Sequence, residues 1–265
     1  MGLCWGSFLN VLAYRLMHDA RLFTLRSHCP CCRHVIAWYD NIPLVSWLVL
    51  RGKCRRCGTS ISWLYPFTEL VTALLFVMLF NKITLVPFAL WDQDKLWFYG
   101  FACMQSYQSL VAYLIFISAL VASTRTDFDA MAIPQAFTLW LVPLGVFCAY
   151  LGIIYVSLWE SIIGAVLGYG ILWAVAMIFK YTTGREGMGI GDMELLAMIG
   201  SFIGPVGIWV SLMVGSLSGL VLGGLYLVIN HKKRGTRIPF GPFLALGALV
   251  YFFLATPLLV LLLEI

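Results

Sequence analysis

Charged residues are scarce in this chain, and that scarcity indicates its class. Only 11% of the 265 residues are charged and 62% are hydrophobic, whereas about 25% charged residues are usual in a soluble domain. Segments of about ten residues with alternating polarity, typical of membrane barrels, are also lacking. The long apolar runs that are present suit helices, because lipid admits only helices and closed barrels. The sequence therefore predicts an all-α polytopic membrane helix bundle.

The N-terminal segment lacks both a basic signal-peptide start and the roughly 20 residues of a spanning helix. We expect residues 1–14 to be the end of a first spanning helix whose beginning lies outside this sequence, or a re-entrant or interfacial segment. Seven further apolar runs predict about eight spans in all. These runs are residues 64–80, 97–122, 136–156, 162–179, 193–203, 207–229 and 242–263, the fifth and sixth meeting at Gly204 and Pro205.

Lys and Arg are unevenly distributed, which predicts an orientation. If eight spans alternate, all 17 of them except Lys82 and Lys95 fall on one side of the membrane. Cytoplasmic loops are enriched in these residues, so the basic, Cys-rich segment 15–62 and the loops at 124–134 and 181–192 are predicted to be cytoplasmic. The net charge of +5 then reflects orientation and not nucleic-acid binding. The predicted domains are a partial first transmembrane helix (1–14), a cytoplasmic domain (15–62) and a transmembrane bundle (63–265).

Four cysteines of the cytoplasmic domain form two Cys-x-x-Cys pairs, Cys29 with Cys32 and Cys54 with Cys57. Four thiolates at this spacing suit a tetrahedral structural zinc ion. Disulfide or redox chemistry and free thiols are the alternatives, although the cytoplasm disfavours disulfides. A domain this small has little core, so we expect metal binding to contribute much of its folding free energy.

A few carboxylates fall at membrane depth, where burying charge is costly. They are Glu69, Asp127, Asp129, Asp192 and Glu194. Two carboxyl groups in a partly dry site cannot easily both ionise, so one can act as a base and the other as an acid in hydrolysis. The alternatives are an ion or proton pathway in a transporter or accessory membrane protein, and helix capping by Asp127 and Asp192 without further function.

Two motifs around these acids resemble the type 4 prepilin leader peptidases, which are membrane aspartic proteases of the Gly-x-Gly-Asp type. Asp127 lies seven residues before Pro134, and Gly189, Gly191 and Asp192 form a Gly-x-Gly-Asp sequence. Further matching motifs follow in the order expected of that family. They are residues 6–11 (GSFLNV), 39–43 (YDNIP), 51–54 (RGKC), 65–70 (YPFTEL) and 239–247 (PFGPFLALG).

The resemblance implies a function and assigns roles to residues. It implies cleavage after a Gly, on the cytoplasmic side of the bacterial inner membrane, of the short basic leader of pilin or pseudopilin precursors. Asp127 and Asp192 take the catalytic positions, supported by Gly189, Gly191, Asp129 and Glu194. The resemblance also implies methylation of the new N-terminal amine with S-adenosylmethionine. Gly52, Lys53 and Glu69 match positions that we link to methyl transfer, although a turn glycine, an orientation signal and a helix-end acid explain them equally well.

The expected partners are precursor polypeptides and membrane lipid, with no nucleic acid. The chain departs from the family pattern at three places. The first helix is incomplete, Gln135 stands where an acid usually follows the proline, and Glu194 stands where a lysine usually follows Gly-Asp. The last change places a negative charge two residues from Asp192, which predicts a higher proton affinity for that carboxylate.

Overall fold

The computed structural model of the chain describes residues 1–17, 27–85, 99–184, 187–229 and 239–263. It divides into two compact units, Met1–Val86 and Pro87–Ile265, which are described separately below. The described residues form helices and two isolated β-bridges, with no strand among them. The predicted all-α class is therefore confirmed. Lys95, one of the two basic residues predicted to lie on the other side of the membrane, and the basic residues Lys232, Lys233, Arg234 and Arg237 lie outside the described residues.

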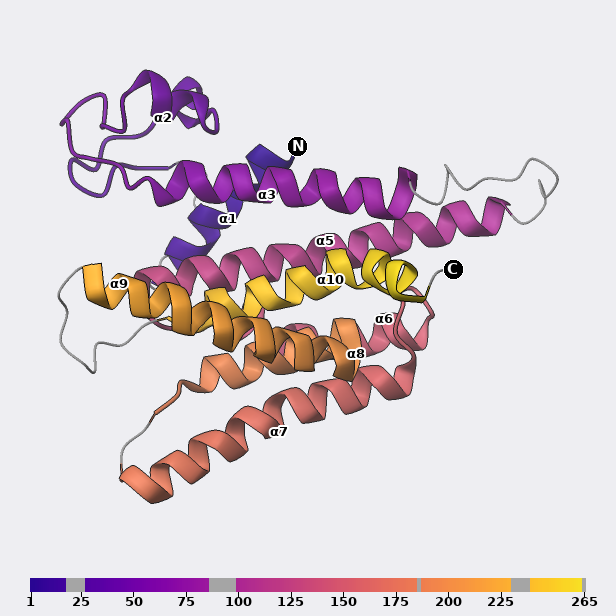
Figure 1. Ribbon diagram of the computed structural model, residues 1–265. Coiled ribbons are helices and arrows are strands. Elements are labelled where there is room, and N and C mark those ends of the chain that lie inside the picture. Colours follow the sequence, from indigo (N-terminus) through magenta and orange to yellow (C-terminus); the bar gives the residue numbers. More distant parts are fainter. Residues whose placement is uncertain (18–26, 86–98, 185–186, 230–238, 264–265) are drawn as a thin grey trace. The chain divides into compact units, whose positions relative to one another are not determined.

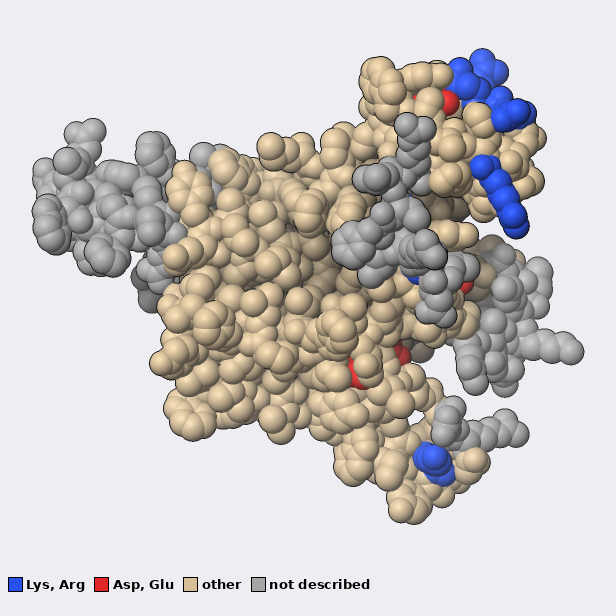
Figure 2. Space-filling model, turned by 180° about the vertical axis from the view of Figure 1, so that it is seen from behind, with Lys and Arg blue, Asp and Glu red and all other residues tan. Residues whose placement is uncertain are grey.

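The first unit consists of two packed apolar helices and a small Cys-rich part between them in sequence. Helix α1 (Gly2–Met17) packs against α3 (Leu64–Phe80), and the π-helical turn η2 (Asn81–Leu85) continues α3. The Cys-rich part carries the 3-10 turn η1 (Trp38–Asn41) and the short helix α2 (Val45–Val49). Figure 2 shows Lys and Arg side chains gathered on this part, where the exposed ones are Arg33, Arg51, Lys53, Arg55 and Arg56.

The contact between α1 and α3 depends on small and polar residues. A Cβ on Gly6 would lie 2.8 Å from the Cα of Glu69, so only glycine permits this approach. The Thr68 hydroxyl donates to Asn10 Oδ1 at 2.7 Å, and Asn10 Nδ2 donates to the Tyr65 carbonyl at 3.2 Å. Interhelical hydrogen bonds and small residues are the usual means of association between helices in lipid. The motif at residues 6–11 thus has a structural role.

The second unit is a bundle of long helices (Figure 1). Its principal helices are α5 (Tyr99–Ala130), α7 (Leu158–Thr183), α8 (Ile190–Ser218) and α10 (Gly241–Leu263). Short elements connect them: η4 (Gln135–Phe137), η5 (Leu139–Leu141), α6 (Val142–Tyr150), η6 (Gly219–Gly223) and α9 (Gly224–Ile229). Stacked Phe116 and Phe202 contribute to the core between α5 and α8.

Helix α8 reverses direction at Gly204, which has φ 74° and ψ −176° and precedes Pro205. A Cβ on Gly200 would lie 2.7 Å from Ile208 Cδ1, although eight residues of straight helix span about 12 Å. Figure 1 shows the two halves of α8 running in opposite directions. The two predicted spans that meet at Gly204 and Pro205 are therefore two antiparallel segments.

Close glycine contacts hold the first half of α8 against α7. Gly164 and Gly200 face each other so closely that a Cβ on either would overlap the backbone of the other. One helical turn further, Gly168 lies directly on the Leu196 carbonyl. The opposite side of α7 carries exposed apolar side chains, including Trp159 and Val166. This distribution suits a helix with one face in the protein and the other in lipid.

Four helical segments among the described residues are long and apolar enough to cross a membrane: Leu64–Ile83, Tyr107–Ala130, Leu158–Thr183 and Ile190–Tyr226, the last containing the reversal. Gln135–Tyr150 and Gly241–Leu254 are shorter apolar helical segments. Several predicted boundaries differ from the structure, and α7 extends about one turn beyond the predicted run 162–179 at each end. Helix α5 continues past residue 122 to Ala130, and the run 136–156 contains two 3-10 turns before α6.

Candidate active site and metal centre

Asp127 lies in the last turn of α5 and is only 5% exposed. Its Oδ2 accepts a hydrogen bond of 2.9 Å from the backbone N–H of Gly241, the first residue of α10. A free N–H at a helix N-terminus is a natural donor to a carboxylate. The C-terminal turn of α5 and the N-terminus of α10 therefore together position one carboxyl oxygen of Asp127.

Asp192 lies in the first turn of α8, whose N-cap residue is Gly189. The Asp192 N–H donates to the Gly189 carbonyl at 3.3 Å, and the residue is half-buried. The neighbouring Gly191 packs against Ile133, which also contacts Gly241, the donor to Asp127. The structure thus brings together the two acids that the sequence singles out, although they lie 65 positions apart along the chain.

Ile133 connects the surroundings of the two aspartates. A Cβ on Gly191 would lie 3.1 Å from the Ile133 Cβ, and a Cβ on Gly241 would lie 3.1 Å from the Ile133 Cδ1 and 2.8 Å from Asp127 Oδ2. The Ile133 side chain therefore packs between the glycine next to Asp192 and the glycine that donates to Asp127. By contrast, a Cβ on Gly189 would meet only Asp192 Oδ2 at 3.8 Å, an ordinary contact.

Asp129 points away from this arrangement. It is exposed and pairs with the buried Arg125 one turn earlier on α5. Residue 131, a methionine with φ 51°, ends the helix immediately afterwards. The structure thus places Asp129 in an ion pair along α5.

Glu194 is buried and both of its carboxyl oxygens accept hydrogen bonds. Gln135 Nε2 donates to Oε1 at 2.9 Å, and the Thr138 hydroxyl donates to Oε2 at 3.1 Å. Residues two apart on a helix do not face each other, so Glu194 points away from Asp192. Two of the departures from the family pattern, Gln135 and Glu194, are therefore partners in one hydrogen bond.

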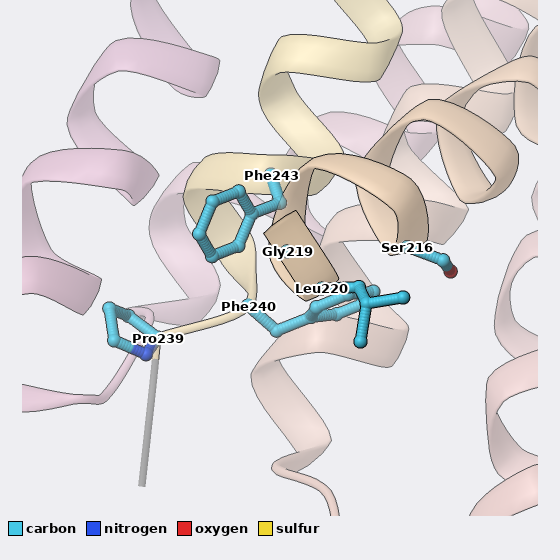
Figure 3. A pocket seen from close by; sticks show the side chains of 6 residues that line it. All are labelled: Ser216, Gly219, Leu220, Pro239, Phe240 and Phe243. Carbon is cyan, nitrogen blue, oxygen red and sulfur yellow. The ribbon is translucent and has the colours of Figure 1, made fainter. Parts of the chain in front are cut away.

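An apolar pocket of about 260 Å³ lies between the turn η6 and the segment that leads into α10 (Figure 3). Its walls come from the end of α8, the π-helical turn η6 and the segment that begins α10. They consist of Ser216, Gly219, Leu220, Pro239, Phe240 and Phe243. Single π-helical turns are frequent at functional sites. The lining is mostly apolar, and its residue Phe240 directly precedes the glycine that donates to Asp127.

The two Cys-x-x-Cys pairs of the first unit adopt the same backbone structure. The N–H of Cys29 and of Cys54 donates to the carbonyl five residues later, at 2.9 and 2.8 Å. The N–H four residues later donates back to each cysteine carbonyl at 2.9 Å. Arg33 and Gly58, which follow the second cysteine of each pair, have φ of 54° and 71°. Each pair thus forms one tight turn that directs two thiols to the same side.

The four Sγ atoms of these pairs lie within 4.8 Å of one another. Cys29 Sγ and Cys57 Sγ are 3.8 Å apart, which matches the edge of about 3.8 Å expected for a tetrahedron with metal–sulfur bonds of about 2.3 Å. The donor set therefore fits a metal ion such as zinc. Cys31 is exposed and lies outside this group.

The three residues linked to methyl transfer also lie in the first unit. Glu69 is buried on α3, and its Oε2 accepts the Leu44 N–H at 2.8 Å. Gly52 is buried with φ 66°, and a Cβ there would lie 3.0 Å from the ring of Trp47. Helix α2, which follows Leu44, carries Trp47, so Glu69 and Gly52 both contact the segment 44–49. Lys53 is exposed and pairs with Ser60 in a β-bridge.

Sequence reasoning did not assign Gly241, Ile133 or Thr138 to the site. Gly241 contributes a backbone N–H and Ile133 an apolar side chain, and both features are too common in this sequence to indicate a site. Only the motif at residues 239–247 drew attention to the region of Gly241. Only the tertiary structure reveals what each of the three contacts.

Comparison with known proteins agrees with these motifs. Residues 1–83 match the family described as the bacterial peptidase A24 N-terminal domain, and residues 114–228 match the type IV leader peptidase family. A prepilin leader peptidase/N-methyltransferase of Stutzerimonas stutzeri is 36% identical over 94% of this chain and 87% of its own length.

Two further curated relatives carry the same name. The one from Aeromonas hydrophila is 41% identical over 91% of this chain and 84% of its own, and the one from Pseudomonas aeruginosa is 36% identical over 93% and 86%. No solved structure matches the chain. With relatives above 30% identity along most of both chains, and with Asp127 and Asp192 brought together, the chain belongs to the type IV leader peptidase family.

Proposed function

We propose that this chain cleaves the short basic leader from type 4 prepilin or pseudopilin precursors, with Asp127 and Asp192 as the catalytic pair. The observation that carries the proposal is the meeting of two acids from α5 and α8 beside Gly241, in a chain of the leader peptidase family. Both acids lie within one turn of a helix end. Transporters place coupling acids near the midplane of the membrane, so this position favours hydrolysis over ion transport.

The proposed reaction needs one ionised and one protonated carboxyl group. The N–H of Gly241 suits Asp127 as the ionised group, which takes a proton from water as the oxygen attacks the scissile carbonyl carbon. Asp192 supplies a proton to the leaving amine when the carbon–nitrogen bond breaks. No covalent intermediate forms. After the step Asp127 is protonated and Asp192 is ionised, so proton exchange with water must restore the starting protonation states before the next turnover.

The substrate geometry follows from the membrane. A precursor with a basic leader and an apolar helix would keep its helix in the bilayer and its leader in the cytoplasm. The scissile bond would then lie at the interface, where the ends of α5 and α8 would receive it. The distribution of Lys and Arg supports this orientation, with the chain as a multi-pass protein of the bacterial inner membrane and its Cys-rich domain in the cytoplasm. The partners would be precursor polypeptides and lipid, without nucleic acid.

We also propose that the first unit methylates the new N-terminal amine. S-adenosylmethionine would supply the methyl group. Glu69, Gly52 and Lys53 are the candidate residues. The contact of Glu69 and of Gly52 with the segment 44–49 supports grouping these two, and Lys53 follows Gly52 directly in sequence. Zinc held by the four cysteines would be structural, because all four positions of a tetrahedral ion are then filled by thiolates.

Incubation of the purified chain with a pilin precursor and labelled methyl donor tests both activities. We expect leader release followed by incorporation of label at the new amine. Asp127→Asn should abolish cleavage yet still methylate a polypeptide supplied without its leader. Folded, metal-loaded protein that leaves the precursor intact would contradict the peptidase proposal. Failure to label the leaderless polypeptide would contradict the methyltransferase proposal alone.

A further inference from the structure

The buried carboxylate of Glu194 has no direct role in the proposed chemistry, yet two side chains from one connecting segment bind it. Gln135 and Thr138 both follow α5, on the turn η4 and just after it. Glu194 and Thr138 are 4% and 0% exposed, whereas Gln135 is exposed. An exposed amide therefore reaches inward to a buried acid on α8. This contact attaches the connecting segment to the helix that carries Asp192.

The same segment contacts both aspartates' surroundings at its other end. Ile133, two residues before Gln135, packs against Gly191 and Gly241. Gly241 in turn donates its N–H to Asp127. The contacts thus form a continuous path between the two aspartates. From Asp192 it follows α8 to Glu194 and crosses the hydrogen bond to Gln135. It then returns along the chain to Ile133, which contacts Gly241, the donor to Asp127.

We propose that Gln135 and Glu194 are positioning residues, whose hydrogen bond fixes Ile133 and so sets the separation of Asp127 and Asp192. The inference rests on the proposed peptidase function and adds residues that act through others. Glu194 points away from Asp192 on the helix, so its contribution is to hold geometry. Without this hydrogen bond Thr138 still joins the segment to Glu194. Residues 131–135, however, lose their side-chain attachment to that acid, so Ile133 can shift away from Gly191 and Gly241.

Because Gln135 is exposed, truncating its side chain should affect activity without unfolding the protein. Gln135→Ala and Glu194→Gln each remove or weaken the hydrogen bond between Gln135 and Glu194. The double variant Gln135→Glu with Glu194→Gln reverses donor and acceptor and keeps the net charge. Ser161→Ala is the matched control, since it deletes a buried hydrogen bond of 2.7 Å to Ser201 at the opposite end of the first half of α8.

The experiment measures kcat and KM for leader release from a purified pilin precursor, per molecule of folded protein, with thermal unfolding followed in parallel. We expect Gln135→Ala to lower kcat by about tenfold to a hundredfold with KM changed less than about threefold, because small displacements of catalytic groups have effects of that size. The reversed double variant should recover most of kcat. Ser161→Ala should lower thermal stability with kcat unchanged.

Three outcomes would overturn the proposal. They are an unchanged kcat in Gln135→Ala, a loss seen only as a smaller folded fraction, and a double variant no better than its single components. The activity of the wild type separates the peptidase proposal from the positioning proposal. If the wild type does not cleave the precursor, the peptidase function is wrong. If the wild type cleaves and Gln135→Ala has the same kcat, only the positioning role is contradicted.

Discussion

Replacing Gly241 with alanine is the sharpest steric perturbation of the proposed site. The new Cβ would lie 2.8 Å from Asp127 Oδ2 and 3.1 Å from Ile133 Cδ1. Ordinary van der Waals contact begins at 3.4 Å, so the Asp127 carboxyl must move by roughly half an ångström or rotate. Either movement lengthens or breaks the 2.9 Å hydrogen bond from the Gly241 N–H.

The size of the effect follows from that hydrogen bond. Hydrogen bonds to charged groups contribute about 1.5–3 kcal/mol, and each 1.36 kcal/mol of activation free energy is a factor of about ten in rate. If the bond is needed in the transition state, Gly241→Ala should lower kcat for leader release by about tenfold to 150-fold. Overpacking should also cost about 1–3 kcal/mol of stability.

The assay is leader release from a purified precursor by protein that remains folded at the assay temperature. Gly170→Ala provides the matched control, because a Cβ on that helical glycine of α7 meets nothing within 4 Å. Its activity should equal that of the wild type. A Gly241→Ala protein with wild-type kcat would show that the carboxyl of Asp127 need not occupy the observed position, and would refute the reasoning.

Three further predictions concern the metal, the second activity and the glycines. Metal analysis should find about one zinc per chain, and chelation should lower the thermal stability of the first unit. Substantially less than one zinc would contradict the structural role. Glu69→Ala should abolish methyl transfer but leave cleavage, since it removes the acceptor of the Leu44 N–H; retained methylation would exclude Glu69. Gly191→Ala should slow cleavage more than Gly189→Ala, because only the former presses on Ile133; equal rates would contradict that steric argument.

The helices were largely predictable because their signal is local. Apolar runs, the Gly204 and Pro205 boundary and the paired cysteines each follow from composition or spacing over a few residues. The end of α5 was less accessible. Residues 123–130 carry polar and charged side chains, a composition that predicts a loop. In the structure Arg125 and Asp129 form an ion pair along one face of α5, and the helix continues to Ala130.

The sequence indicated the acids of the candidate site but not the residues that contact them. Glu194 illustrates the difference: its proximity in sequence suggested an effect on Asp192, whereas the helix directs it toward Gln135 and Thr138. Which residues contact each other across helices depends on helix rotation and depth, and sequence spacing alone does not determine either. The hydrogen bond from Gly241 to Asp127 joins positions 114 residues apart.

The central claim is that Asp127 and Asp192 act together in cleavage. The most direct measurement is the rate of leader release by Asp127→Asn and Asp192→Asn, which keep side-chain shape and remove the proton-transfer function. Glu160→Gln is the control, since that exposed capping-box acid is replaceable by glutamine. Both aspartate variants should lose at least about a thousandfold in kcat while remaining folded, with the control unaffected. Cleavage above a tenth of the wild-type rate by either aspartate variant would contradict the account.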